Sequence, residues 1–460
     1  MKNRLLTLTL CLLLTCLSKF TAAEVLKPDS LIAPEVAIED IDKWLQFIES
    51  THPDLAYTVK NPASFYQDVD RLKSGLNKPI TRRAFWLELM KFNSRFNDGH
   101  LSVTPNSLDA LVRQSIDEGE RVLPFQFKIK DNALVVLSSL NGDESKLKGY
   151  QVLSINSVPV ASIMPALLQL THGDSDTHRE AILSTRFSIY YWLLYGFADK
   201  FVLDLKKDIY LKDVSIDVSE QKSTDLLLPD KSFAGNFTAT VLDDDAVLKI
   251  KSFRNYEEKE QFKAFFDSFF TSIAEKKIRR LYIDIRGNGG GDDTWKQAIM
   301  PYIASKPWRS GSTYKVKILS GQGNEKHAVG DVVNGEVESF EKVNNDLPNK
   351  FRGEVVILVD GFSYSSAILF INVVQDFCFG SVAGDAIGGK VGQTGGTQQL
   401  ILNSSGLKAI SPRFILNKPK GGNGLDLVNI DLPVNYDITE PEELITQLRE
   451  MDVAGFCNQL

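Results

Sequence analysis

Two continuously apolar segments limit the fold of this chain more strongly than any other feature. Residues 281–285 (LYIDI) and 354–360 (EVVILVD) lack the polar–apolar alternation of a half-exposed strand. This pattern is typical of strands that are buried on both faces. A further strand is predicted over residues 246–253, and helical patterns follow over residues 257–274 and 365–377. Strands that alternate with helices predict an α/β unit with helices packed on the sheet.

The N-terminal part of the chain has helical periodicity instead. Apolar residues recur at helical spacing from Ile38 to Ile48, and the pattern stops at His52. A second helix is predicted from Thr81, a plausible N-cap, to a turn at residues 97–100. We therefore expect residues 24–115 to form an N-terminal helical domain.

The segment that follows has strand-like alternation. Phe125, Phe127 and Ile129 alternate with polar residues and precede a turn and a second apolar run. Residues 149–160 (GYQVLSINSVPV) resemble the Gly-x-x-(apolar)-x-x-Ile-Asn strand of a PDZ domain. A generic β-hairpin is the alternative explanation of the same pattern. We expect a degenerate PDZ-like module with a helical segment over residues 116–215, in which residues from about 170 onward are helical.

The first 23 residues have the layout of a secretory signal peptide. Basic residues are followed by an apolar run from Leu5 to Leu17 and by small residues that end at Ala23. The run is too short for a membrane-spanning helix, which needs about 20 apolar residues. We expect export, to the periplasm or the medium, after cleavage near Ala23. The α/β unit is expected over residues 216–460.

The net charge and the cysteine content limit the classes of molecule that this chain is expected to bind. Loss of the three positive charges in the signal segment would lower the formal net charge from −7 to −10. Such a protein is a poor candidate for binding nucleic acid or an anionic membrane surface. Cys378 and Cys457 would remain, either paired or as free thiols, and neither has metal-site spacing.

The turn after the first apolar strand is rich in glycine. Residues 284–293 read DIRGNGGGDD, and glycines allow backbone N–H groups to point at an anion. A dinucleotide loop is disfavoured because Asp292 stands where the third glycine of GxGxxG belongs, and the Asp292–Asp293 pair would repel phosphate. The N–H groups of Gly289 or Gly290 are better suited to an oxyanion hole.

The turn after the second apolar strand is rich in serine. It places Ser365 near a helix N-terminus, where the N–H of Ser366 can face the same oxyanion. A serine nucleophile needs a nearby base, and Lys390 could serve if burial lowered its pKa. On residue types alone, an N-capping serine and a surface lysine are the favoured explanation of this pattern.

Residues 281–411 resemble the catalytic core of the tail-specific, or C-terminal processing, serine proteases. The resemblance rests on IDIRGNGGG, ILVDGFSYSSA, the Gln-Asp that ends at Asp376 and the Gly-Asp-x-x-x-Gly-Lys loop that ends at Lys390. It implies a crotonase-like (ClpP-like) spiral core and makes Ser365 the nucleophile. The serine-to-lysine spacing of 25 residues matches the family and implies Lys390 as the base.

Some features resemble the tricorn protease, in which a histidine of a D-x-H turn is the base. Ile368 stands where lysine-type members usually have glutamate, and the DGH turn ends at His100. The spacing therefore favours Lys390 and this second likeness favours His100. The glutamate expected before a late glycine turn is missing from the neighbourhood of residues 421–425.

The remaining polar residues are expected to support the fold. Asp284 and Arg286 are predicted to hydrogen bond or pair around the glycine loop, and Asp376 to brace the end of a helix. We expect His52 to be structural. The segments around His172, His178 and His327 are polar, so surface positions are expected for all three.

Taken together, the residues and the resemblance predict an exported serine endopeptidase. It would hydrolyse extended or unfolded polypeptides through a serine acyl-enzyme and would need no metal or cofactor. The alternative is a catalytically inactive protease-fold protein that binds a peptide or a small apolar ligand. The oligomeric state cannot be predicted from the sequence.

Overall fold

The computed structural model describes residues 27–225, 232–254 and 259–451. Two features of the sequence lie outside these residues, namely the expected signal peptide and Cys457. Of the two cysteines that follow the expected signal peptide, the described one, Cys378, is disulfide-bonded. Within the described ranges, no helix has the length and apolar character needed to cross a bilayer.

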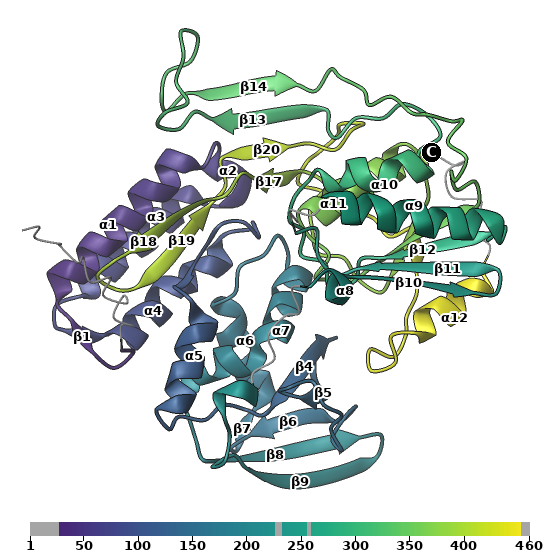
Figure 1. Ribbon diagram of the computed structural model, residues 1–460. Coiled ribbons are helices and arrows are strands. Elements are labelled where there is room, and N and C mark those ends of the chain that lie inside the picture. The colour runs from purple at the N-terminus through teal and green to yellow at the C-terminus, as the bar shows by residue number, and fades with distance from the viewer. Residues whose placement is uncertain (1–26, 226–231, 255–258, 452–460) are drawn as a thin grey trace, which may run out of the picture.

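The C-terminal half is built on a six-stranded sheet (Figure 1). Its strands, in spatial order, are β10 (Phe237–Leu242), β11 (Asp245–Ile250), β12 (Arg280–Asp284), β15 (Glu354–Val359), β16 (Ser381–Gly384) and β21 (Leu432–Pro433). All neighbours are parallel except β10 and β11. The α/β prediction for this half is confirmed.

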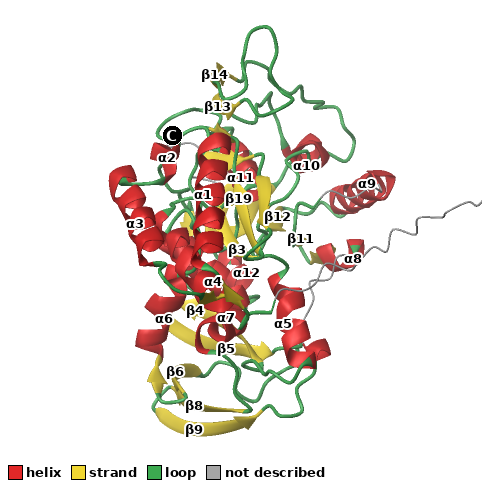
Figure 2. Cartoon of the chain, turned by 90° about the vertical axis from the view of Figure 1, so that its left-hand side faces the viewer, coloured by secondary structure: helices red, strands yellow, loops and turns green. Residues whose placement is uncertain are grey.

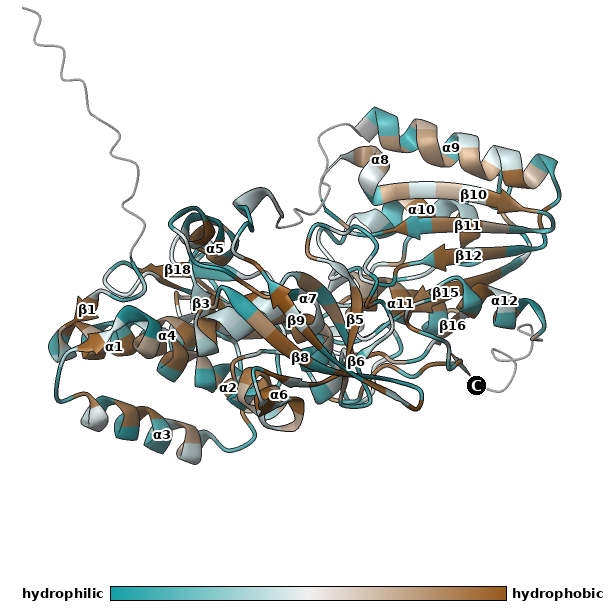
Figure 3. Ribbon diagram, turned by 90° about the horizontal axis from the view of Figure 1, so that it is seen from below, coloured by the Kyte–Doolittle hydropathy of each residue, from teal (hydrophilic) through white to brown (hydrophobic). Residues whose placement is uncertain are grey.

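Both faces of this sheet are covered, which explains the continuous apolar runs. Leu281 and Ile283 pack into the core formed with α9 (Lys259–Glu275), α10 (Trp295–Ile303) and α11 (Ser366–Asp376). Tyr282 and Leu358 pack on the opposite face with α12 (Glu443–Arg449). In Figure 3, β11 and β12 lie between helices and carry much of the apolar colour.

The N-terminal part is helical, with strands from elsewhere in the chain. Its elements are β1 (Leu31–Ile32), α1 (Pro34–Thr51), α2 (Leu55–Thr58), α3 (Pro62–Gly75), β2 (Ile80–Thr81), α4 (Arg82–Met90), the 3₁₀ helix η1 (Lys91–Arg95), β3 (Ser102–Pro105) and α5 (Leu108–Asp117). The Thr81 hydroxyl caps α4 by accepting from the Ala84 N–H, as predicted. The α-helix ends earlier than expected, since the last turn tightens into η1.

A second sheet follows, in which β4 (Phe125–Lys130) lies at one edge. Its other members are β5 (Ala133–Ser139), β6 (Gln151–Ile155), β7 (Val158–Pro159), β8 (Lys200–Lys207) and β9 (Tyr210–Asp217), packed with α6 (Val160–Gln169) and α7 (Asp176–Tyr195). The expected helix over residues 170–215 is correct only to Tyr195. Beyond it, β8 and β9 form a hairpin. Alternate residues of β8 are buried, as is typical of a strand, and a turn at Asp208, whose φ is positive, connects β8 to β9.

Late strands return to the N-terminal helices. β19 (Leu407–Ser411) lies between β18 (Gln398–Leu402) and β3 and pairs with both. All three strands share one hydrophobic core with the helices and the second sheet. Figure 2 shows β19 and β3 against α1 and α4. Thus β3, which follows the DGH turn, is fixed by a strand about 300 residues away in sequence.

The expected excursion over residues 310–350 contains a hairpin. β13 (Thr313–Lys317) and β14 (Val332–Glu336) form a four-stranded sheet with β20 (Phe414–Leu416) and β17 (Gln393–Gly395), and the hairpin lies at the top of Figure 1. The short elements η2 (Ser223–Asp225) and α8 (Phe233–Asn236) precede β10.

The outer edge of β4 is capped by side chains of α7. The Ile129 N–H donates to the Ser184 hydroxyl at 2.8 Å, and the Ser188 hydroxyl donates to the Phe125 carbonyl at 2.7 Å. Both serines are buried. At these two residues the edge cannot pair with another strand unless α7 moves.

We expect Ser184→Ala with Ser188→Ala to lower the free energy of unfolding by about 1–3 kcal/mol per lost hydrogen bond, because each change leaves a buried backbone group unpaired. Urea denaturation measures the change. Ser74→Ala, which removes an exposed hydroxyl bonded to the Asp70 carbonyl in α3, is the control and should cost less. Equal effects would show that the two caps do not stabilise the edge.

Candidate active site

Ser365 lies at a strained turn between β15 and α11. Its φ of 58° and ψ of −121° are a conformation that glycine adopts more easily than serine. Positive φ costs a residue with a Cβ of the order of 1–3 kcal/mol and often marks a functional position. The side chain is half-buried, so that its hydroxyl is held at the surface of the site.

His100 faces this serine. Its Nε2 lies 2.9 Å from the Ser365 Oγ, and its Nδ1 lies 3.0 Å from the Thr394 Oγ1. The Thr394 hydroxyl donates its single hydrogen to the Asp98 Oδ1 at 2.8 Å, so that it can only accept from His100. His100 must therefore carry its proton on Nδ1, which leaves the Nε2 lone pair free to accept from Ser365.

Asp98 is the buried anion at the end of this chain of hydrogen bonds. Its Oδ1 also accepts from the His100 N–H at 2.7 Å, and its Oδ2 lies 3.5 Å from the His52 Nε2. Burial would raise the pKa of Asp98, but the contact with His52 and the charge and N–H of His100 outweigh it and hold the pKa at about 2. Asp98 is therefore an acceptor at neutral pH.

A second buried carboxylate, Asp174, joins the DGH turn to the serine turn. It accepts from the Tyr364 hydroxyl at 2.7 Å and from the Gly99 N–H at 2.9 Å. Its other oxygen accepts from the Lys390 N–H at 2.9 Å. Burial raises the pKa of Tyr364 well above its ordinary value, with Asp174 adding to the effect, so Tyr364 remains a donor.

Lys390 points away from the serine. Its Nζ donates to the Asn97 carbonyl and lies 5.0 Å from the centroid of the Tyr57 ring. Burial lowers the pKa of Lys390, although Asp174 and Asp98 oppose the shift. The ammonium thus ties the loop of residues 388–394 to the start of the DGH turn.

The glycine loop packs against Ser365. A Cβ on Gly290, whose φ is 93°, would lie 2.6 Å from the Ser365 Cβ and 2.9 Å from the Ser366 nitrogen. The Gly290 N–H donates to the Asn288 side chain at 2.9 Å. Among the described residues, the N–H groups of Gly289 and Ser366 have no acceptor, so these two are available to an oxyanion.

Asp360 holds the two turns together. Its Oδ1 accepts from the N–H groups of Gly287 and Phe362, both at 3.0 Å. Its Oδ2 lies 3.4 Å from the Nζ of Lys128 in the second sheet. Because one carboxylate fixes both backbones, the glycine loop and the serine turn keep a constant separation.

Of the expected supporting residues, Asp284 and Arg286 lie where β12 leads into the glycine loop, whereas Asp376 ends α11, far along the helix from Ser365. Arg286 donates to both oxygens of Asp284, at 2.8 and 2.9 Å. Asp376 accepts from the Lys420 N–H at 2.8 Å at the end of α11. Within the described ranges, no group of three or more possible ligands is arranged to hold a metal ion.

Several residues of the site were missed by sequence reasoning. Thr394 and Asp174 belong to no motif singled out in the sequence, and Tyr364, although it lies within ILVDGFSYSSA, was given no role. The surface positions expected for His172 and His178 are wrong, because both line the cavity beside His100 and His178 is buried against Tyr364, with ring centroids 4.0 Å apart. Their polar neighbours in sequence gave no signal of this.

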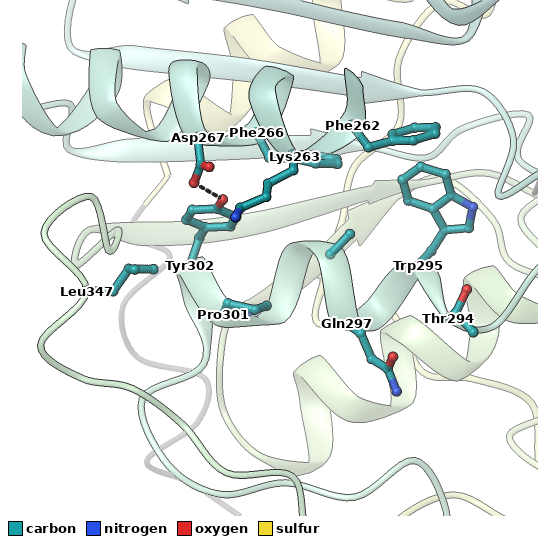
Figure 4. A pocket seen from close by; sticks show the side chains of 11 residues that line it. Phe262, Lys263, Phe266, Asp267, Thr294, Trp295, Gln297, Pro301, Tyr302 and Leu347 are labelled. Atoms are coloured by element: carbon teal, nitrogen blue, oxygen red, sulfur yellow. Dashed lines mark hydrogen bonds between the residues drawn. The ribbon is translucent and has the colours of Figure 1, made fainter. Parts of the chain in front are cut away.

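Two cavities differ in their relation to this cluster. One of about 400 Å³ is lined by His100, Gly289, Phe362 and Tyr364 and opens beside the serine. Another, of about 560 Å³, lies between α9 and α10, where Phe262, Phe266 and Trp295 supply apolar walls and Tyr302 donates to Asp267 (Figure 4). None of the residues around Ser365 lines the second cavity.

Comparisons with known proteins agree with the sequence motifs. Residues 244–423 match the model of peptidase family S41. Mature CPAF has a TM-score of 0.62 at 11% identity, over 91% of this chain and 99% of that chain. Mature CPAF complexed with lactacystin also has a TM-score of 0.62 at 11% identity, over 90% of this chain and 97% of that chain. The photosystem II D1 C-terminal processing protease has a TM-score of 0.47 at 14% identity, over 91% of this chain and 98% of that chain.

At these identities the structural likeness shows the fold alone. A search of curated proteins found no match.

The strain at Ser365 gives a stability prediction. We expect Ser365→Gly to raise the free energy of unfolding by about 1 kcal/mol relative to Ser365→Ala, because only glycine relieves the positive φ. Both variants lose the hydroxyl, so the alanine variant is the matched control. Equal denaturation midpoints would show that the turn is unstrained.

Proposed function

We propose that Ser365 is the nucleophile and His100 the general base of this chain, which is a serine-type peptidase of the tail-specific kind. Its residues 244–423 match the model of peptidase family S41. The observation that carries the proposal is the 2.9 Å contact between the His100 Nε2 and the Ser365 Oγ, with Nδ1 held by Thr394. The position of Lys390 supports a structural role for it instead.

The chemistry follows from these contacts. The Ser365 Oγ attacks a peptide carbonyl as its proton passes to the His100 Nε2, and Thr394 and Asp98 stabilise the imidazolium that forms. His100 then gives the proton to the leaving amine, and an acyl-enzyme remains on Ser365. A water molecule then attacks the ester carbonyl as its proton passes to His100. The bond between the acyl carbon and the Ser365 Oγ breaks, His100 returns the proton to Oγ, and the second product leaves with a new carboxyl group.

The developing oxyanion would be held by two backbone N–H groups. Gly289 and Ser366 are favoured because the Gly290 N–H is already donated to Asn288. The N-terminus of α11 adds a favourable dipole at the same point. Each such donor contributes roughly 3 kcal/mol to transition-state stabilisation.

We further propose that the substrates are extended or unfolded polypeptides and that the enzyme is exported. The six-stranded sheet and its helices are assigned as a crotonase-like core, and β4–β9 with α6 and α7 as a degenerate PDZ-like module. Since Ser184 and Ser188 cap β4, strand addition at that edge would require α7 to move.

The alternative is an inactive protein that binds a peptide or a small apolar ligand. The apolar cavity between α9 and α10 favours this alternative, because it is large enough for a small molecule and is not lined by the residues around Ser365. The ordered contacts of His100 favour catalysis.

Substitutions at the three candidate groups separate the proposals. We expect Ser365→Ala and His100→Ala to lower kcat/KM on an unstructured polypeptide by about 10⁴-fold or more, because each removes a member of the catalytic unit. Lys390→Met, which keeps the length of the side chain, should retain activity within about tenfold, since Lys390 acts through Asn97.

Circular dichroism and labelling of Ser365 with a fluorophosphonate are the controls for folding and for the nucleophile. An inactive Lys390→Met with an active His100→Ala would assign the base to Lys390. A folded wild type that neither cleaves nor is labelled would leave the binding role as the explanation.

The pH profile gives an independent test. Burial lowers the pKa of His100 below its ordinary 6.5, against the pull of Asp98 and Asp174, and the base is active when neutral. The acidic limb of kcat/KM should therefore lie below pH 6.5, with activity lost as the pH falls through it. A lysine base would instead require activity to rise as Lys390, ordinarily at 10.5, loses its proton. Initial rates from pH 4 upward distinguish the two limbs.

A further inference from the structure

The cavity of about 400 Å³ beside His100 has two kinds of lining. His100, Gly289 and Phe362 bring it next to the proposed oxyanion site. Asp109, Arg186 and Lys408, which come from α5, α7 and β19, add charged side chains to the same cavity. A substrate whose carbonyl is at Ser365 would therefore have a neighbouring group within reach of charged side chains.

The charged lining is predominantly cationic. Arg186 Nη1 lies 3.3 Å from the Asp109 Oδ1, and this pair is partly exposed. In the part of the chain that the structure describes, no carboxylate lies within 4 Å of the Lys408 ammonium. Two cations and one anion thus line the cavity, which leaves one positive charge unbalanced.

The histidines of the cavity do not change this balance at neutral pH. Burial, with smaller contributions from His100 and Arg186, holds the pKa of His172 at about 4. Burial also keeps the pKa of His178 well below its ordinary value. Both rings are neutral walls.

The backbone at Arg186 supports a dedicated position. Its φ of −136° and ψ of 16° are not helical, and they interrupt α7 at this residue. A regular helix would direct the side chain elsewhere on its surface. The kink therefore sets where the guanidinium enters the cavity wall.

We propose that this cavity binds a carboxylate of the polypeptide substrate through Arg186 and Lys408, an inference that rests on the proposed peptidase function. A planar guanidinium and an ammonium without a partner are complementary to a carboxylate, whereas a cationic or wholly apolar group would leave them uncompensated. The carboxylate is either an acidic side chain next to the cleaved bond or the α-carboxylate of the chain terminus.

Two pairs of peptides test the proposal and distinguish these sources. One pair carries an internal Glu or Gln at the position next to the cleaved bond, and the other pair has a free or an amidated C-terminus. We expect kcat/KM for the carboxylate member of at least one pair to be about tenfold higher, since a charge-assisted contact of this kind is worth on the order of one decade. Mass spectrometry locates the bond that is cut.

Charge reversal identifies the residues. Arg186→Glu and Lys408→Glu should each abolish or invert the preference, while Asp109→Asn, which releases Arg186, should increase it. Lys206→Glu makes the same charge change on the exposed face of β8, outside the lining of the cavity, and should alter nothing. If Arg186→Glu disturbs the kink in α7, Lys408→Glu on β19 carries the test alone.

The outcomes separate two failures. Cleavage with equal rates for both members of both pairs, or a preference unchanged by Lys408→Glu, would overturn the carboxylate site and leave the peptidase function intact. If the folded wild type cleaves none of the peptides and no unstructured polypeptide, the proposed function fails, and this inference fails with it.

Discussion

The buried carboxylate of Asp98 is the interaction on which the site depends. It is removed from water, so its charge must be compensated nearby. The His100 N–H and the Thr394 hydroxyl donate to it, and the His52 ring nitrogen lies 3.5 Å from its second oxygen. Because Thr394 has one hydrogen and gives it to Asp98, the orientation and tautomer of His100 follow. A neutral side chain at position 98 would leave both undetermined.

Asp174 has a comparable role for the backbone. It accepts from Gly99, Tyr364 and Lys390, which belong to three segments that are distant in sequence. The two carboxylates therefore fix the DGH turn, the serine turn and the loop of residues 388–394 relative to one another. Asp360 does the same for the glycine loop, so the site is assembled largely by acceptors that each bind several N–H or O–H donors.

This arrangement also explains why the positive φ of Ser365 persists. Tyr364, directly before it, is held by Asp174, and the Tyr364 N–H donates to the Asn288 carbonyl at 3.0 Å. The Ser366 hydroxyl donates to the Gly291 carbonyl at 2.8 Å. Neighbours fixed on both sides leave Ser365 no relaxed alternative, and the strain directs its hydroxyl toward His100.

The sequence by itself determined the local features. The apolar runs at 281–285 and 354–360 specified strands buried on both faces, Thr81 specified a helix start, and the glycine and serine turns identified both candidate motifs. It left the base open between Lys390 and His100 and gave no sign of Thr394, Tyr364 or Asp174. It also placed His172 and His178 at the surface and extended a helix over the β8–β9 hairpin.

Only the tertiary structure decided those points. Periodicity and turn chemistry act over a few residues, whereas the direction of a side chain such as Lys390 depends on acceptors, here Asn97 and Tyr57, that lie hundreds of residues away. His100 meets Ser365 because β3 pairs with β19 and because Asp174 joins two turns. Such contacts have no local signature, since each depends on the packing of the whole chain.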